Sequence, residues 1–239
     1  MQVTVIGCST CWTNKPVSSY CINGNILVDC GEGTTKHYKK CGVDFFEIKH
    51  IFITHFHTDH FTGLSAHISQ VLAYEGEDKK YRLNIYGPKG LLKALNIFKE
   101  NFACPSINKR VEDYINVFEL ENNSQICVEG LKIKAFKLDH GGIENLAYVF
   151  DDDKVKVGFS GDCTYTKQVD NFVKNCDVAF VDCCSEKTTK NHMGADKFCY
   201  LQGKFLKTKM IAVHSTDEFL KKAKKYKIKT TKSAKKYRF

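Results

Sequence analysis

Residues 51–60 read Ile-Phe-Ile-Thr-His-Phe-His-Thr-Asp-His, which places three imidazoles and one carboxylate within six residues, directly after an apolar run. The apolar run predicts a buried strand, and His55 and His57, two positions apart, leave its end on the same side. Asp59 and His60 are expected in the turn that leads into a helix, because apolar residues then recur with a helical period. Histidine nitrogens and carboxylate oxygens bind zinc and similar ions, so the segment predicts a metal site where a strand meets a helix.

Further ligands are expected at the ends of later strands, and His140, Asp162 and His214 each follow a segment with the pattern of a strand. If these strands end at one edge of the sheets, their polar residues meet the first cluster there. Chain order then predicts one ion held by His55, His57 and His140, a second held by Asp59, His60 and His214, and Asp162 as the bridge between them. Such nitrogen and oxygen donors suit two divalent ions, zinc or manganese, rather than a site dominated by thiolates.

Strands and helices alternate along the chain in an order that repeats roughly once. Strands are expected near residues 2–7, 19–23, 26–30, 50–54, 82–86, 115–120, 131–138, 145–150, 154–160, 177–182 and 209–214. Helices are expected near residues 34–42, 61–74, 89–101, 167–175, 194–203 and 216–226. With 239 residues and no low-complexity linker, the chain predicts one α/β domain over 1–239, made of two halves that meet near residues 110–130. Its two sheets would stack face to face, with helices covering the outer faces.

No secretory signal and no membrane-spanning run is apparent, and the twelve cysteines are scattered through expected strands and helices. This pattern favours reduced thiols in a cytoplasmic protein over a disulfide framework. Cys8 and Cys11 form a C-x-x-C pair that could bind zinc or be redox-active. No second pair accompanies it, so a loop without such chemistry is the favoured interpretation.

The formal net charge of +9 comes from the end of the chain. Residues 221–239 contain ten Lys or Arg and no acid, whereas residues 1–220 carry 26 basic and 27 acidic side chains. This basic tail can attract a polyanion or a phosphate-bearing ligand by long-range steering. The alternative is the solvated face of a final helix and strand, which the helical spacing of Phe219, Ala223 and Tyr226 favours.

The cluster His-x-His-x-Asp-His, followed by the later His, Asp and His, resembles the metallo-β-lactamase superfamily, whose fold is an αββα sandwich. Segments 28–34 (Val-Asp-Cys-Gly-Glu-Gly-Thr), 51–64 and 85–91 (Ile-Tyr-Gly-Pro-Lys-Gly-Leu) are similar to its ribonuclease Z branch. The resemblance covers about residues 1–220. It implies two stacked mixed sheets flanked by helices and two divalent metal ions, with zinc first and manganese as the alternative.

The resemblance also implies roles beyond the metal ligands. Asp29 would steady a metal ligand, and Asp59 would orient the attacking hydroxide in addition to binding metal. His192 would be the general acid, held in place by a carboxylate. Asp182 aligns with the glutamate that serves this purpose in the branch, and Glu186 lies nearby in the sequence as an alternative.

For a helix end and three further histidines, the sequence gives less specific predictions. A helix that begins near Gly194 could turn its N-terminus toward the phosphate. His37, His50 and His67 are expected to pack or to lie on the surface. His67 follows His60 by two helical turns, so it could approach the site from the same helix face.

The spacing between two of the ligands bears on the substrate. In ribonuclease Z proteins, a long arm between the corresponding histidine and the bridging aspartate grips the body of precursor tRNA. Only 21 residues separate His140 from Asp162 here, and they read as two strands, 145–150 and 154–159, joined by three aspartates. Without the arm, the phosphate-backbone contacts that a large RNA needs are lost. The chain is then similar to arm-less relatives of bacteria and phages, the cyclic-nucleotide phosphodiesterases of the anti-Pycsar type.

The resemblance therefore predicts a dinuclear-metal phosphodiesterase that hydrolyses small cyclic nucleotides, in which metal-bound hydroxide attacks phosphorus and His192 protonates the leaving ribose oxygen. It also implies a homodimer in the cytoplasm of a bacterium or of a phage-infected host. The alternatives are a ribonuclease Z-like endonuclease that processes tRNA 3′ ends, a thioester or lactone hydrolase, and a binding protein on an inactive scaffold.

Overall fold

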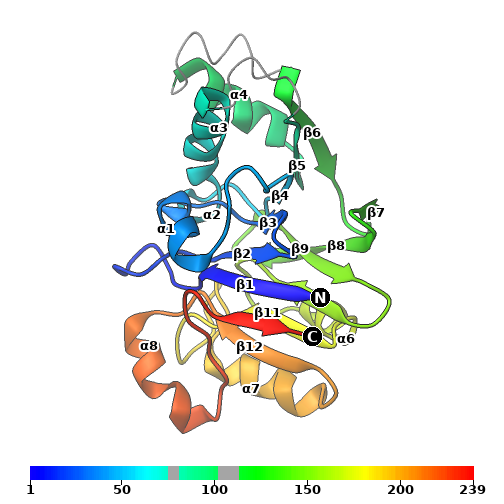
Figure 1. Ribbon diagram of the computed structural model, residues 1–239. Helices are drawn as coiled ribbons and strands as arrows, with labels where there is room; N and C mark the ends of the chain where they lie inside the picture. Colours follow the sequence, from blue (N-terminus) through cyan, green and yellow to red (C-terminus); the bar gives the residue numbers. More distant parts are fainter. Residues whose placement is uncertain (75–80, 102–112) are drawn as a thin grey trace.

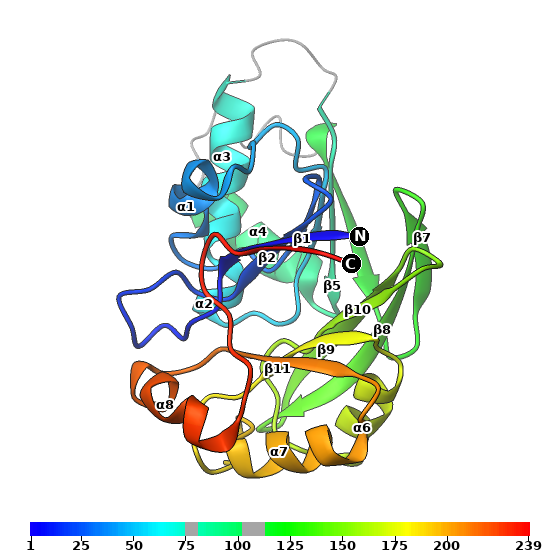
Figure 2. The same cartoon turned by 60° about the horizontal axis from the view of Figure 1, so that its bottom comes forward.

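Two β-sheets lie face to face, and helices cover the outer face of each, in the computed structural model of the protein (Figures 1 and 2). The structure describes residues 1–74, 81–101 and 113–239. The first sheet has the strand order β13-β1-β2-β3-β4-β5-β6, and the second has the order β12-β11-β10-β9-β8-β7. The αββα sandwich expected from the sequence is therefore confirmed.

The elements have the following bounds. The strands of the first sheet are β1 (Gln2–Gly7), β2 (Ser19–Ile22), β3 (Ile26–Val28), β4 (His50–Phe52), β5 (Leu83–Pro88), β6 (Ile115–Leu120) and β13 (Lys236–Arg238). Those of the second are β7 (Gln125–Val128), β8 (Leu131–His140), β9 (Ile143–Asp151), β10 (Lys156–Phe159), β11 (Val178–Asp182) and β12 (Lys209–Val213). The helices are α1 (Thr34–Cys41), α2 (Thr58–Phe61), α3 (Gly63–Tyr74), α4 (Leu91–Asn101), α6 (Lys167–Lys174), α7 (Ala195–Lys204), α8 (Asp217–Lys222) and the 3-10 helix η1 (Ala223–Tyr226). Figure 1 shows α1, α3 and α4 beyond the first sheet and α6, α7 and α8 beyond the second.

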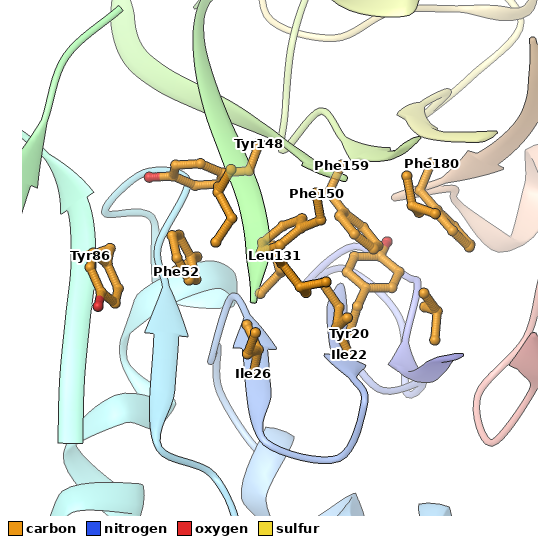
Figure 3. Close-up of a cluster of buried hydrophobic side chains, with 14 of the residues drawn as sticks. Tyr20, Ile22, Ile26, Phe52, Tyr86, Leu131, Tyr148, Phe150, Phe159 and Phe180 are labelled. Carbon is orange, nitrogen blue, oxygen red and sulfur yellow. The ribbon is translucent and has the colours of Figure 1, made fainter. Parts of the chain in front are cut away.

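The core between the sheets is built largely from aromatic rings. Phe52 of β4 stacks on Tyr86 of β5 with ring centroids 4.4 Å apart, and Phe159 of β10 stacks on Phe180 of β11 at 5.1 Å. Tyr20 reaches across from the first sheet to Phe159, with centroids 4.8 Å apart. Figure 3 shows these rings between the two sheets. Truncating a fully buried ring such as Phe52 to Ala would cost about 3–5 kcal/mol, so this layer fixes how the sheets meet.

The parallel strands bring the ends of several segments to one edge of the sandwich. Strands β3, β4 and β5 are parallel, and so are β10, β11 and β12. Each is a short apolar run, because its two faces are covered by helices on one side and by the opposite sheet on the other. The segments that follow these strands carry most of the candidate ligands.

Several elements differ from the sequence expectations. Strand β4 ends at Phe52, and the chain continues as a loop, although the Ile53 N–H still donates to the Tyr86 carbonyl oxygen at 2.8 Å. Asp59 and His60 lie inside the short helix α2 rather than in a turn. The helix expected over residues 216–226 divides into α8 and η1. The sequence did not predict β7 and β13, because each is a short, partly polar edge strand with one partner.

The basic tail, residues 221–239, joins the two layers of the sandwich. Its last strand, β13, pairs antiparallel with β1 of the first sheet. The Ser233 hydroxyl donates to the Ile6 carbonyl oxygen at 2.7 Å. The Ala212 N–H, in β12 of the second sheet, donates to the Lys229 carbonyl oxygen at 2.8 Å. The tail is therefore built into the fold and is not a separate appendage.

The structure also bears on the expectations for membrane-spanning helices and for the cysteines. Within the described ranges, no helix combines the length and the apolar character needed to cross a membrane. The cysteines in those ranges are free thiols. Cys8 is half-buried and Cys11 is exposed in the loop between β1 and β2, so the C-x-x-C pair forms no disulfide.

Candidate metal centre

The first group of candidate ligands is His55, His57, His140 and Asp162, whose ligand atoms all lie within 4.8 Å of one another. His140 Nε2 lies 3.2 Å from His57 Nδ1 and 3.8 Å from Asp162 Oδ2. His55 Nε2 lies 3.7 Å from the same carboxylate oxygen. Three imidazoles and one carboxylate oxygen thus converge from both sheets, and they are the set that the sequence predicted around one ion.

The second group is Asp59, His60, Asp162 and His214, again with ligand atoms within 4.8 Å of one another. His60 Nε2 and His214 Nδ1 each lie 3.1 Å from Asp162 Oδ1. Asp59 Oδ2 lies 3.8 Å from His60 Nε2 and 3.9 Å from His214 Nε2. Asp162 therefore faces the first group with one oxygen and the second group with the other, as a carboxylate shared between two ions must.

The burial of these atoms tests whether the residues suit a cation. His55 Nε2, His60 Nε2 and Asp162 Oδ1 are buried, and among the described residues none of them makes a well-oriented hydrogen bond, although His60 Nε2 and Asp162 Oδ1 lie close to each other. Each buried polar atom without a partner costs roughly 1–3 kcal/mol. Divalent ions satisfy such nitrogen and oxygen atoms, so the two groups fit a pair of divalent metal ions.

The protonation of the ligands follows from burial and from their neighbours. Burial lowers the pKa of His214 to about 4 and that of His55 well below its ordinary value, so both imidazoles are in the neutral form that binds metal. Burial also lowers the pKa of His60, but the Asp162 and Asp29 carboxylates outweigh burial and raise it. The pKa of Asp162 is held well below its ordinary value, because the surrounding histidines, led by His214, outweigh burial.

Asp29 orients His60, in agreement with the role that the resemblance implied. Its Oδ2 accepts a hydrogen bond from His60 Nδ1 at 2.7 Å, which leaves His60 Nε2 for the centre. The Thr54 N–H and hydroxyl donate to the two Asp29 oxygens at 2.8 and 2.9 Å. The Thr54 hydroxyl also lies 3.0 Å from His55 Nδ1. The sequence did not predict Thr54, although its place directly before His55 could have indicated it.

Two glycines let α2 approach the loop after β3. A Cβ on Gly63 would lie 1.9 Å from the Gly31 carbonyl oxygen, and a Cβ on Gly31 would lie 1.8 Å from the Asp59 carbonyl oxygen. The Cys30 N–H donates to the His60 carbonyl oxygen at 2.8 Å in the same contact. Only glycine fits at both positions, so this contact fixes where the ligands of α2 lie.

His140 is held by a backbone group. Its Nδ1 donates to the Asn191 carbonyl oxygen at 2.7 Å, so its Nε2 faces the other ligands. The Asn191 side chain also packs on the turn after β8, because a Cβ on Gly141 would lie 2.2 Å from its amide oxygen. No pattern of side chains could have predicted Asn191, since the contact that orients His140 is made by a carbonyl group.

A third group adjoins the first two and consists of Asp162, Asp182 and His192. His192 Nδ1 lies 2.9 Å from Asp182 Oδ2 and 3.9 Å from Asp162 Oδ2. Burial lowers the pKa of His192, but the Asp182 hydrogen bond and charge outweigh it and raise the pKa to about 9. Burial raises the pKa of Asp182 to about 7, against the opposing effect of His192. The alternative partner, Glu186, binds Lys222 at 2.6 Å instead.

The N–H groups at the N-terminus of α7 are not available to bind a phosphate. The Gly194 N–H donates to the Thr188 hydroxyl oxygen, and the Ala195 N–H donates to the Ser185 carbonyl oxygen, both at 2.9 Å. The loop 185–188 therefore satisfies the N–H groups at this end of the helix. The prediction that this helix end would bind phosphate is wrong.

The remaining histidines pack away from the two ligand groups. His67 is buried beside Tyr38 and Phe45, with ring centroids 5.9 and 5.2 Å away. His50 lies in strand β4, and His37 is partly exposed on α1. These places agree with the packing and surface roles expected for the three residues.

One family model matches nearly the whole chain. Residues 1–237 match the family model described as anti-Pycsar protein Apyc1. Ribonuclease Z of Pyrococcus abyssi is 33% identical over 139 residues, which cover 57% of this chain and 42% of that protein. The chain thus spans less than half the length of the curated ribonuclease Z relatives that it matches first.

Solved structures share the fold at low sequence identity. The metallo-β-lactamase fold protein YhfI from Bacillus subtilis has a TM-score of 0.80 and 19% identity, covering 99% of this chain and 98% of that chain. Yeast PDE1 has a TM-score of 0.74 and 14% identity, covering 98% of each chain. The family match, the shared fold and the two His/Asp groups agree. The chain belongs to the anti-Pycsar Apyc1 family, within the ribonuclease Z-like part of the metallo-β-lactamase superfamily.

Proposed function

We propose that this chain is a dinuclear-metal phosphodiesterase that hydrolyses small cyclic nucleotide phosphodiesters. The proposal is carried by the position of His192, whose Nδ1 lies 2.9 Å from Asp182 and 3.9 Å from the carboxylate that two candidate metal groups share. Hydrolysis of a phosphodiester requires both neutralisation of charge at phosphorus and a proton for the leaving oxygen. Both requirements can be met within this one centre.

The seven candidate ligands would hold two divalent ions, which lower the pKa of a coordinated water and offset phosphate charge. The chain's own residues supply the remaining steps. Asp59 accepts a hydrogen bond from the attacking water and orients it toward phosphorus. Asp182 holds His192 Nδ1, so His192 Nε2 carries the proton that passes to the leaving ribose oxygen. Zinc is the expected native metal for this donor set, with manganese as the alternative.

The proposed size of the substrate rests on the strand pair that joins His140 to Asp162. Strands β9 and β10 pair antiparallel directly, with Asp151 opposite Lys156. Residues 140–162 are all described and include no arm on which the body of a tRNA could rest. A small substrate would gain its affinity from the centre itself rather than from many backbone phosphates. A homodimer and a cytoplasmic location belong to the same proposal and are carried over from the resemblance.

A substrate panel tests the proposal. The protein is loaded with zinc or manganese and assayed against 3′,5′-cyclic nucleotides, 2′,3′-cyclic nucleotides, bis(p-nitrophenyl) phosphate and precursor tRNA. We expect the highest kcat/KM for a cyclic nucleotide. Preference for precursor tRNA at low enzyme concentration would instead support a ribonuclease Z-like endonuclease, the second candidate, which the 33% identity to the Pyrococcus abyssi protein favours.

A ligand variant with a matched control separates an enzyme from an inactive scaffold. His57→Ala removes one candidate ligand and is expected to reduce bound metal and to abolish turnover. His37→Ala changes a partly exposed histidine on α1 and is expected to alter neither quantity. Metal content and kcat are measured on both variants. Full metal content and full turnover in His57→Ala would show that the activity does not reside in this centre.

A further inference from the structure

The segment between β1 and β2, residues 8–18, borders the metal centre but contributes none of its candidate ligands. Figures 1 and 2 show this β1–β2 segment as a dark-blue loop that projects from the sandwich beside α8. It contains Trp12, the single tryptophan of the chain. The proposed mechanism gives the segment no task.

Both ends of the β1–β2 segment are tied to the loop that carries His214. The Ser9 hydroxyl donates to the Ser215 carbonyl oxygen at 3.3 Å, and the two residues form an isolated parallel bridge. The Ser18 hydroxyl lies 3.5 Å from His214 Nδ1. Ser9 and Ser18 are both buried. The base of the segment is therefore fixed relative to the second candidate metal group.

The middle of the segment is held at the same edge. Lys15 forms an ion pair with Asp217, the first residue of α8. Burial and then the nearby Asp59 carboxylate raise the pKa of the Cys11 thiol. Because Ser9 and Ser18 are held against Ser215 and His214, and Lys15 against Asp217, the segment that contains residue 11 lies at the rim of the centre.

Trp12 follows Cys11 directly, and it is 88% exposed. A tryptophan side chain buries about 150–250 Å² when it is covered, so an exposed one leaves a large hydrophobic gain available to a ligand. The site therefore combines a polar centre suited to a phosphodiester with a flat aromatic surface one residue beyond its rim. A nucleotide has the same two parts, a phosphodiester and a base, joined by one ribose.

We propose that Trp12 stacks on the base of the nucleotide while the metal centre holds the phosphodiester, an inference that rests on the proposed function. Every nucleobase has a face on which an indole can stack, so this contact would favour nucleotides over other phosphodiesters without selecting strongly among bases. Alanine substitution at such a contact lowers affinity roughly 5- to 100-fold.

Fluorescence provides a direct test, because Trp12 is the only tryptophan and its emission reports on this position alone. AMP is added to the metal-loaded protein, and ribose 5-phosphate serves as the ligand without a base. We expect saturating AMP to quench the emission strongly and saturating ribose 5-phosphate to change it little. Equal responses to the two ligands would contradict stacking.

Kinetics on variants provide a second test. The quantity measured is the ratio of kcat/KM for 3′,5′-cyclic AMP to kcat/KM for the corresponding cyclic phosphate of ribose without a base. Trp12→Ala is expected to lower this ratio roughly 5- to 100-fold, whereas Trp12→Phe keeps an aromatic face and most of the ratio. Leu206→Ala is the matched control, since Leu206 is an apolar residue that is 84% exposed after α7, and it should leave the ratio unchanged.

The possible failures can be told apart. An unchanged ratio in Trp12→Ala, with emission that does not respond to AMP, would overturn stacking and leave the hydrolysis proposal standing. Absence of hydrolysis of every phosphodiester by the unmodified protein would overturn the proposed function, and the role of Trp12 with it. Sedimentation that shows a dimer dissociating in Trp12→Ala would mean that Trp12 contacts a second copy of the chain, and the stacking proposal would be wrong.

Discussion

The Asp182→Asn variant should change the pH range of catalysis more than its maximal rate. It removes the charge that lies 2.9 Å from His192 Nδ1 but keeps an oxygen that can accept the hydrogen bond. Asp182 outweighs the effect of burial and raises the pKa of His192 from 6.5 to about 9. A general acid works in its protonated form, so activity is present below this pKa and is lost as the pH rises through it. The unmodified enzyme should therefore keep most of its rate to about pH 8.

Without the carboxylate charge, the His192 pKa should return to its ordinary value of about 6.5. A change of about 2.5 units corresponds to about 3 kcal/mol. At about pH 8, the protonated fraction of His192 then falls from about 0.9 to about 0.03, a loss of roughly 30-fold in kcat. At about pH 5.5 the imidazole is protonated in both proteins, so the loss there should be less than about 2-fold.

The assay is a profile of kcat against pH with the best substrate of the panel, accompanied by metal content at each pH. Asp170→Asn is the matched control, because Asp170 pairs with Lys204 away from the centre at 2.7 Å and should leave the profile unchanged. His192→Gln should lower kcat at every pH while the protein retains its metal. If the alkaline limit of Asp182→Asn stays where it is in the unmodified enzyme and the rate falls equally at all pH values, the reasoning is refuted.

Other perturbations follow from the packing. Gly63→Ala would place a Cβ 1.9 Å from the Gly31 carbonyl oxygen, and should cost about 1–3 kcal/mol of stability and roughly tenfold or more in metal affinity, measured by thermal unfolding and metal titration. Gly203→Ala, whose added Cβ would meet nothing within 4 Å, is the control and should not destabilise the protein. Burial lowers the pKa of His67 to about 3, so its contribution to stability is full above about pH 6.5 and declines as the pH falls. His67→Gln should reduce the slope of unfolding free energy against pH by up to about 1.4 kcal/mol per unit in that range, and parallel slopes would contradict this. Deleting residues 231–239 removes β13 and exposes the edge of β1, so the Tm should fall by several degrees; an unchanged Tm would show that the pairing adds no stability.

The ligand groups could be predicted because each ligand is a side chain that follows a strand with a recognisable pattern. His55 and Asp162 are examples, since a short apolar run indicates the strand and the polar residue then marks its end. Contacts made by backbone groups leave no such pattern. The carbonyl oxygen of Asn191 holds a ligand, and the carbonyl oxygen of Ser185 accepts from the end of α7, yet neither contact depends on the identity of the residue that makes it.

Edge strands were the least predictable part of the fold. Residues 125–128 form β7 at the edge of the second sheet, where half of the strand faces solvent and no continuous apolar run is required. The composition of the basic tail does not indicate the strand β13, because Tyr237 is its one apolar residue and lies between a lysine and an arginine. Both strands are specified mainly by the neighbour that they pair with, which is the next strand, β8, for β7 and the distant first strand, β1, for β13.

The candidate centre also brings together residues that are distant in the sequence. His57, in the loop after β4, meets His140, at the end of β8, across a separation of 83 residues. An ion held by both would close a long loop, as a disulfide does, and its binding free energy would be added to that of folding. Metal coordination would then hold the two sheets together at one edge, and the packed aromatic rings would hold them together elsewhere. Metal supply would govern how long the folded chain survives proteolysis, independently of whether any substrate is present.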